Sequence, residues 1–240
     1  MKKLTSSLFI VGALLATVLS TYAVPIGSSN EAFDYAVRGR DLSRLSMGLY
    51  SMETEREIRW EGTGAVETLK SQKVQGYFGV DIVRWLTIYA VGGQSDVKFG
   101  NNPSSDGESE FGFGFRANLL NHFIREPAPM EDTLRINLGG QFTRNKADNG
   151  AGEMEWDEMS AALTMALVNH TTSYKLFAPE SIALYFGPLF SQYVSDDFEA
   201  EDDMGAVIGM EIFFMDSIIL DLEVQHFEET SVGVGINFHF

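Results

Sequence analysis

The chain has 240 residues, a formal net charge of −17 at pH 7, 45% hydrophobic residues and no cysteine. This apolar content is too high for a disordered acidic chain. The lack of cysteine excludes disulfide scaffolds, cysteine-based zinc sites and thiol catalysis. The acidic excess argues against a nucleic-acid partner, because phosphate contacts need clustered Lys and Arg.

The first 23 residues have the three parts of a secretory signal peptide. Lys2 and Lys3 give a basic start, residues 8–19 are apolar, and Thr21-Tyr22-Ala23 places small residues at a cleavage site. The apolar run is shorter than the roughly 20 residues that a membrane helix needs. We therefore expect cleavage after Ala23, with an uncleaved anchor as the alternative.

Residues 24–42, VPIGSSNEAFDYAVRGRDL, precede the first expected strand. They lack a clear apolar stripe, so we expect a periplasmic lead-in, with a short plug as the alternative. Asn30 is a candidate N-cap for a short helix.

From about residue 43 onward the pattern has period two, and no stretch of 18 apolar residues follows that would suggest a helical membrane protein. At the C-terminus Val232, Val234, Ile236, Phe238 and Phe240 alternate with small or polar residues. Strict alternation predicts strands with one apolar face. The expected strands, ten in all with eight as the alternative, are 43–58, 65–82, 86–99, 109–120, 133–144, 154–168, 181–194, 204–215, 218–227 and 231–240.

The second face of these strands is rich in Gly, Ser and Asn, as in Gly112, Gly114, Gly233 and Gly235. Glycine is poor on a solvated strand face but suits a narrow barrel interior. We therefore interpret the apolar face as lipid-facing and the small polar face as the lumen of a closed antiparallel transmembrane β-barrel. The alternative is a secreted soluble barrel.

The expected connections alternate between the two ends of this barrel. Tight links at 83–85 and 215–217 fall at the periplasmic end, whereas the polar segments 100–108, 145–153 and 195–203 fall outside. Two periplasmic links, 121–132 and 169–180, are longer than the turns usual there. Aromatic residues near strand ends are expected to lie at the membrane interfaces, with core packing as the alternative; these are Trp60, Trp85, Phe123, Trp156, Tyr174, Phe177 and Tyr193.

With its signal peptide, its alternating segments and a last strand ending in Asn237-Phe238-His239-Phe240, the chain resembles the small bacterial outer-membrane β-barrels. Its size is similar to the OmpA-, OmpX- and omptin-type proteins. The resemblance covers roughly residues 43–240 and implies residence in the outer membrane after passage through the periplasm. It also implies that Phe240 is the assembly signal recognised by the barrel-assembly machinery.

The alternation of side chains along the expected strands places a set of charged residues inside the lumen. Because a barrel of this size is filled by side chains, these charges are expected to pair in a structural network. A polar ion pathway is the functional alternative, and a catalytic carboxylate pair is a third. The expected network is Arg44, Asp81, Arg116, Arg135, Glu158, Glu211, Asp221 and Glu223.

The densest acidic cluster lies in an expected outer loop, and its spacing is not that of an EF-hand. A solvated acidic surface is the plain interpretation; the sharper one is binding of Ca²⁺ or Mg²⁺ that bridges to anionic lipopolysaccharide or to a partner. The residues are Asp196, Asp197, Glu199, Glu201, Asp202 and Asp203. No other cofactor is expected.

The sequence carries no catalytic motif. His226 lies near Glu228, Glu229 and Ser231, which leaves a lipid or peptide hydrolase as a remote alternative. The expectation is a non-enzymatic outer-membrane barrel with a role in envelope structure or surface interaction through its acidic loops. A narrow, porin-like channel for small solutes is the alternative.

Overall fold

The structure is a computed structural model that describes residues 26–28, 44–100, 105–124, 131–148, 152–170, 179–214 and 217–240. Its described part is all β, with strands paired antiparallel. Within these residues there is no helix long and apolar enough to cross a membrane. The strands are β1 (Leu45–Trp60), β2 (Val66–Val83), β3 (Leu86–Phe99), β4 (Ser105–Ile124), β5 (Glu131–Asp148), β6 (Glu153–His170), β7 (Pro179–Val194), β8 (Phe198–Ala200), β9 (Met204–Phe214), β10 (Ile218–His226) and β11 (Thr230–His239).

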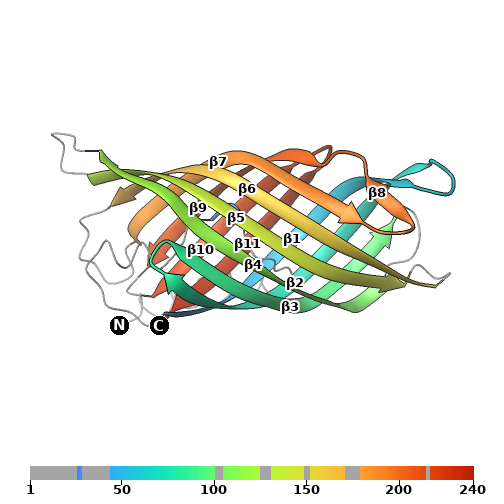
Figure 1. The fold of residues 1–240 in the computed structure, drawn as a ribbon, viewed down its shortest axis with the longest axis horizontal. Helices are drawn as coiled ribbons and strands as arrows, with labels where there is room; N and C mark the ends of the chain where they lie inside the picture. Colours follow the sequence, from blue (N-terminus) through green and yellow to red (C-terminus); the bar gives the residue numbers. More distant parts are fainter. Residues whose placement is uncertain are drawn as a thin grey trace, which may run out of the picture.

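Ten of these strands close into one barrel (Figure 1). Each long strand pairs with its sequence neighbour, β7 pairs with β9, and β11 closes the ring on β1, with Tyr50 opposite Gly235. The prediction of a closed antiparallel barrel of about ten strands is confirmed. The C-terminus and the tight turn at 84–85 lie at one end, and β8 lies at the other. In barrels of this class the chain end marks the periplasmic side, so β8 marks the outer end.

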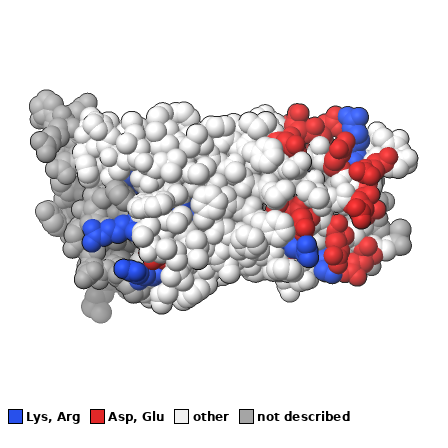
Figure 2. All heavy atoms as spheres, viewed as in Figure 1, with Lys and Arg blue, Asp and Glu red and all other residues white. Residues whose placement is uncertain are grey.

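The outside of the barrel is an apolar belt. Side chains such as Leu49, Phe113, Leu184 and Ile208 are each more than half exposed. Figure 2 shows the middle of the visible face to be almost entirely uncharged, with acidic residues gathered at the outer end. A soluble protein does not expose apolar surface on this scale, whereas a bilayer requires it. The barrel is therefore a transmembrane one.

Several strands run further towards the periplasm than the sequence predicts. β4 continues to Ile124 and β5 begins at Glu131, while β6 continues to His170 and β7 begins at Pro179. A bulge between Asn118 and Leu120 breaks the alternation in β4, so the pattern alone ended that strand too early. The two long periplasmic links thus shorten to residues 125–130 and 171–178.

Inside the barrel, four tyrosines each cover a glycine directly opposite on the neighbouring strand. The pairs are Tyr50–Gly235, Tyr77–Gly48, Tyr89–Gly114 and Tyr185–Gly209. A Cβ on any of these glycines would lie 2.1–2.4 Å from the tyrosine ring. The lumen-facing glycines therefore make room for aromatic rings, which fill the interior.

Candidate functional site: the barrel lumen and its outer rim

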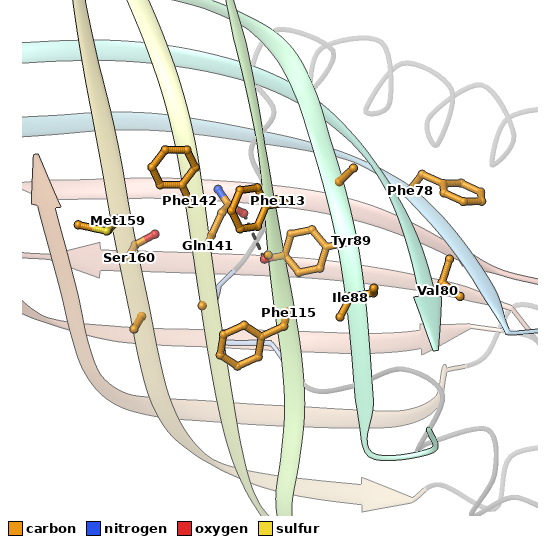
Figure 3. Close-up of a pocket in the computed structure, with 14 residues that line it drawn as sticks. Phe78, Val80, Ile88, Tyr89, Phe113, Phe115, Gln141, Phe142, Met159 and Ser160 are labelled. Carbon is orange, nitrogen blue, oxygen red and sulfur yellow. Dashed lines mark hydrogen bonds between the residues drawn. The ribbon is translucent and has the colours of Figure 1, made fainter. Parts of the chain in front are cut away.

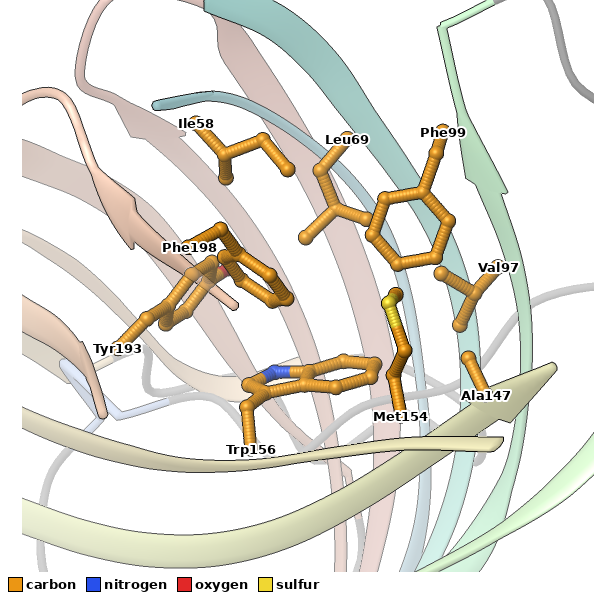
Figure 4. Packing of buried hydrophobic residues seen from close by; sticks show 9 residues of the cluster. All are labelled: Ile58, Leu69, Val97, Phe99, Ala147, Met154, Trp156, Tyr193 and Phe198. Carbon is orange, nitrogen blue, oxygen red and sulfur yellow. The ribbon is translucent and has the colours of Figure 1, made fainter. Parts of the chain in front are cut away.

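The outer mouth of the lumen is closed by an apolar cap. Phe198 of β8 is fully buried at its centre, and β8 is held there by three residue pairs with the end of β1, from Ile58 to Trp60. Its ring packs edge-on or tilted against neighbouring aromatics, with centroids 5.8–6.4 Å away. Figure 4 shows the cap side chains converging on one another from strands around the barrel. They are Ile58, Leu69, Val97, Phe99, Ala147, Met154, Trp156, Tyr193 and Phe198.

Trp156 and Tyr193 belong to this cap. Both point inward and are buried, so they form part of the barrel interior instead of a membrane-interface girdle. Parity could have shown this, since Trp156 shares the face of Glu158, which was assigned to the lumen. Trp85 and Phe123 are about half exposed near the periplasmic end; residues 174 and 177 lie outside the described residues.

Beneath the cap lies a buried ion-pair layer. The Lys73 ammonium is 2.7 Å from a Glu158 carboxylate oxygen and 3.4 Å from one of Glu110. Gln75 donates to Glu110 at 2.5 Å, and the Ser191 hydroxyl donates to Glu158 at 3.2 Å. One cation thus serves two carboxylates, whose remaining contacts come from neutral donors. The arrangement matches the paired network that low dielectric demands.

Arg56 is buried beside this layer and under the cap. Its guanidinium carbon lies 3.6 Å from the centre of the Phe227 ring and 5.2 Å from that of Tyr193. Its Nε is 3.5 Å from Glu228, and it donates to the backbone carbonyl of Asp202. The side chain therefore ties β1 to the connection between β8 and β9 and to the β10–β11 turn.

Arg116 occupies the middle of the lumen. Its guanidinium carbon lies 5.1–5.9 Å from the ring centres of Tyr50, Tyr77 and Tyr89, in the range of cation–π contacts. Tyr89 reaches across to Gln141, to which its hydroxyl donates at 3.2 Å. Among the described residues, aromatic rings and one cation thus occupy this level of the lumen.

On the opposite wall, Tyr185 lies between two buried carboxylates. Its hydroxyl is 3.0 Å from Asp221 Oδ1 and 2.9 Å from Glu223 Oε2. Gln225 donates to the other oxygen of Glu223 at 2.7 Å. Residues 26–28 also lie inside the lumen here, and the Gly27 N–H donates to Glu223 at 3.0 Å.

The remaining residues of the expected network are divided between the lumen and the rim. Arg135, Glu211 and Asp81 are buried, and Asp81 lies 3.3 Å from the His239 imidazole and accepts from Thr87 at 2.6 Å. Arg44 is exposed at the periplasmic end, where its carbonyl accepts from the Asp81 N–H. The prediction that Arg44 faces the lumen assumed that it belongs to the strand, where side chains alternate between the two faces. β1 begins one residue later, at Leu45, so the alternation does not apply to Arg44.

Three buried charges were missed from the sequence: Arg56, Lys73 and Glu110. Lys73 lies on the same strand face as Gln75 and Tyr77, and Glu110 lies on the same face as Gly112 and Arg116. Extending the lumen-facing alternation along each strand would therefore have found both charges. Arg56 follows Tyr50 and Met52 on its face. In that strand the lumen side is partly apolar, which hid the assignment.

The acidic loop lies at the outer rim with its carboxylates turned outward. Asp196, Asp197, Glu199, Glu201 and Asp202 are exposed and Asp203 is half-buried. The Arg59 Nε donates to Glu201 at 2.9 Å, and this contact lowers the pKa of the Glu201 carboxyl below its usual value. Within the described ranges no three acidic or histidine side chains converge as metal ligands would.

A surface recess of about 510 Å³ adjoins this loop. Trp60 and Glu61 line one side, and Asp196 and Asp197 line the other. The two sides are joined by the Glu61 N–H, which donates to the Asp197 carbonyl at 3.0 Å. An aromatic face among three carboxylates favours cationic ligands.

A second hollow lies on the lipid-facing wall across β2 to β6. It has a volume of about 730 Å³ and is lined mainly by apolar side chains, with the Phe113 and Phe142 rings 5.4 Å apart (Figure 3). Phe115 lies over Gly140, where a Cβ would approach its ring to 2.5 Å. In a bilayer this groove faces hydrocarbon, so acyl chains of lipid can fill it.

His226 and Phe240 lie at opposite ends of the barrel. His226 is exposed at the outer rim, 3.1 Å from the Thr230 hydroxyl. Phe240 is half exposed at the periplasmic end, and its N–H donates to the Leu45 carbonyl at 3.1 Å, which extends the β11–β1 seam by one contact.

No protein-family model matches the chain, and no curated protein matches it either. Among solved structures, the COG4313 outer membrane channel from Pseudomonas putida F1 aligns over 92% of this chain and 98% of its own, with 9% identity and a TM-score of 0.42. The translocator domain of the autotransporter NalP from Neisseria meningitidis aligns over 87% and 93%, with 10% identity and a TM-score of 0.32. The Pseudomonas putida toluene transporter TodX aligns over 92% and 96%, with 10% identity and a TM-score of 0.26.

Likeness at this level does not transfer a substrate or an activity to this chain. The class follows from the chain's own features: ten antiparallel strands closed on themselves, an apolar exterior and a polar, filled interior. The protein is a small, closed, transmembrane β-barrel.

Proposed function

We propose that this protein is a non-enzymatic, closed outer-membrane barrel that presents an acidic rim to cations and to the anionic lipids or partners that they bridge. The observation that carries the proposal is closure of the lumen. Below the cap, a cavity between Arg56, Lys73 and Gln141 holds about 30 Å³. That is room for roughly one or two water molecules, far less than a conducting pore requires.

Conductance across a planar bilayer tests this closure. Purified wild-type protein is expected to show no current steps above baseline, because the cap, the ion-pair layer and Arg116 with its tyrosines block the lumen in succession. Steady single-channel steps in the wild type would overturn the proposal of a closed barrel and support a channel.

A narrow channel that opens when the cap moves is the second candidate. The observation that favours it is that β8, a strand of three residues, lies above a lumen lined by Lys73, Glu110 and Glu158. If the cap is the gate, Phe198→Ala combined with Trp156→Ala should conduct while the wild type does not. Phe186→Ala, on the lipid-facing side, is the matched control. A silent double variant would dismiss the cap as the gate and keep the closed barrel.

The acidic rim is expected to bind divalent cations through the recess at Trp60. Ca²⁺ or Mg²⁺ added to chelator-washed, folded protein should change Trp60 fluorescence in a saturable way, because the indole adjoins Asp196 and Asp197. The Asp196→Asn/Asp197→Asn variant should lose most of that response. Glu153→Gln, on the same rim but outside the recess, should keep it. If neither cation changes the fluorescence, the cation-binding role fails while closure stands.

A further inference from the structure

The hollow on the lipid-facing wall is built from two neighbouring rows of outward side chains that cross β2 to β6 in register. Its small residues are Ala90 in the outer row and Gly140, opposite Ala161, in the next row towards the periplasm. Larger exposed side chains such as Phe113 and Met159 flank these small ones (Figure 3). The hollow is therefore a depression with an apolar floor and bulky sides, open to the bilayer.

The first charged row above this hollow is a cross-strand ion pair. Arg144 of β5 lies opposite Asp157 of β6, two residues beyond the Phe142–Met159 pair towards the outer end, about 7 Å along the strands. The Arg144 guanidinium donates to both carboxylate oxygens of Asp157, at 2.8 and 3.0 Å. Below this pair the outward residues of β5 and β6 carry no charge for several rows. The pair therefore stands where hydrocarbon gives way to lipid headgroups.

A second ion pair continues the pattern one row further out. Lys146 contacts Glu155, directly opposite, and also Glu153 at 3.1 Å. Cations therefore stand in one column on β5, and carboxylates stand in a second column beside it on β6. The charged side chains of both columns keep between 28% and 65% of their surface exposed, so a headgroup in the membrane can reach them.

Two adjacent columns of opposite charge select for a headgroup that carries both signs. The Arg144 guanidinium has five N–H donors, and its contacts with Asp157 leave others for a phosphate. The β6 carboxylates accept further N–H bonds, as a primary ammonium group would supply. Three carboxylates stand beside two cations here, so a headgroup with a net negative charge is disfavoured.

We propose that the hollow and the two columns form a binding site for one phosphatidylethanolamine molecule. Its phosphate lies on Arg144 and Lys146, its ammonium group on Asp157 and Glu155, and one acyl chain in the hollow of about 730 Å³. The site is on the outer wall of the barrel, so it depends on neither lumen closure nor the acidic recess at Trp60. Conductance and Trp60 fluorescence do not report on it.

Lipid retention tests the headgroup. The barrel is released from vesicles with equal parts of phosphatidylethanolamine, phosphatidylglycerol and phosphatidylcholine, and native mass spectrometry counts the lipids that stay on the folded protein. Phosphatidylglycerol lacks the cation, and phosphatidylcholine has a cation without N–H donors. Wild-type protein should retain about fivefold more phosphatidylethanolamine than either, the scale of exposed ion-pair contacts. Equal retention of the three lipids, or a preference for phosphatidylglycerol, would overturn the proposal.

Charge variants assign this preference to the two columns. Arg144→Gln combined with Asp157→Asn should reduce retention of phosphatidylethanolamine to that of the other two lipids. The matched control is Arg59→Gln with Glu201→Gln, because this pair has nearly the same exposure, 46% and 29%, but lies away from the hollow. The control should keep the preference. A preference that survives the first change, or that both changes abolish, would contradict the site.

A filled hollow tests the acyl chain separately. Ala90→Phe combined with Ala161→Phe places two rings in the depression and leaves every charge in place. This variant should retain less of all three lipids than the wild type. Ala206→Phe, at an exposed position on β9, adds a ring elsewhere on the barrel wall and should retain as much as the wild type. Undiminished retention by the filled variant would show that the hollow holds no lipid chain, and the proposal would fail.

Discussion

Replacing Lys73 by methionine is expected to lower the free energy of unfolding by about 3–5 kcal/mol, the usual cost of removing one partner of a buried ion pair. Lys73 is the cation within 3.4 Å of both Glu110 and Glu158. Without it, the two carboxylates keep the neutral donors Gln75 and Ser191, and Arg56 is the remaining positive neighbour of Glu158 among the described residues. Urea unfolding of barrels reconstituted in lipid vesicles, followed by tryptophan fluorescence, gives the free energy.

Two further variants separate the ion pair from side-chain packing. Lys70 lies on the outward face of the same strand and pairs with Glu55 at 2.7 Å in an exposed position, so Lys70→Met should cost far less stability than Lys73→Met. Combining Lys73→Met with Glu110→Gln and Glu158→Gln removes all three charges and should recover most of the lost stability. If the single and the triple variants are equally unstable, the effect is one of packing and the ion-pair account is wrong.

The barrel itself was predictable because one physical pattern covers most of the chain. Alternation in the last strand, from Val232 to Phe240, fixed the lipid-facing side, and the glycines opposite fixed the lumen. The strand ends were less predictable where a bulge reverses parity, as between Asn118 and Leu120 in β4. Because a one-residue shift exchanges the two faces of a strand, the alternation in the sequence is interrupted at the bulge, and the predicted strand ends there.

The filling of the lumen was only partly predictable. Parity placed Arg116, Glu158, Asp221 and Glu223 inside; Arg116, Asp221 and Glu223 are buried, and Glu158 is half-buried and contacts Lys73 in the lumen. It could not show which charges meet, because Lys73 and Glu158 lie 85 positions apart in sequence and on strands that are not neighbours in the sheet. Such contacts run across the lumen, and they depend on barrel diameter and strand stagger instead of local pattern.

Closure at the outer end could not be read from the sequence. β8 is three residues long within an acidic stretch, and its short pattern is too weak to predict a strand. Phe198 stands among carboxylates and looked like an isolated loop residue. Only the fold brings it over Phe99 and Trp156, which come from two other strands.

The second large effect is expected from a single methyl group in the lumen. Gly235→Ala should destabilise the barrel by about 1–3 kcal/mol, the range for overpacking a filled interior, because the new Cβ would lie 2.1 Å from two carbon atoms of the Tyr50 ring. Tyr50 cannot easily turn aside. It packs against Tyr77 with ring centroids 5.5 Å apart, and its hydroxyl donates to Asn237.

Gly76→Ala is the matched control, since a Cβ there meets nothing closer than 3.7 Å. Alanine restricts the unfolded chain more than glycine does, so this variant should be neutral or slightly stabilising in the same urea experiment. In a Tyr50→Leu background, Gly235→Ala should lose most of its cost, because the ring that it strikes is gone. An unchanged cost there would mean that glycine at 235 is required by the backbone. Gly235 would then serve strand geometry, and the interpretation that the four glycines opposite tyrosines make room for the rings would fail.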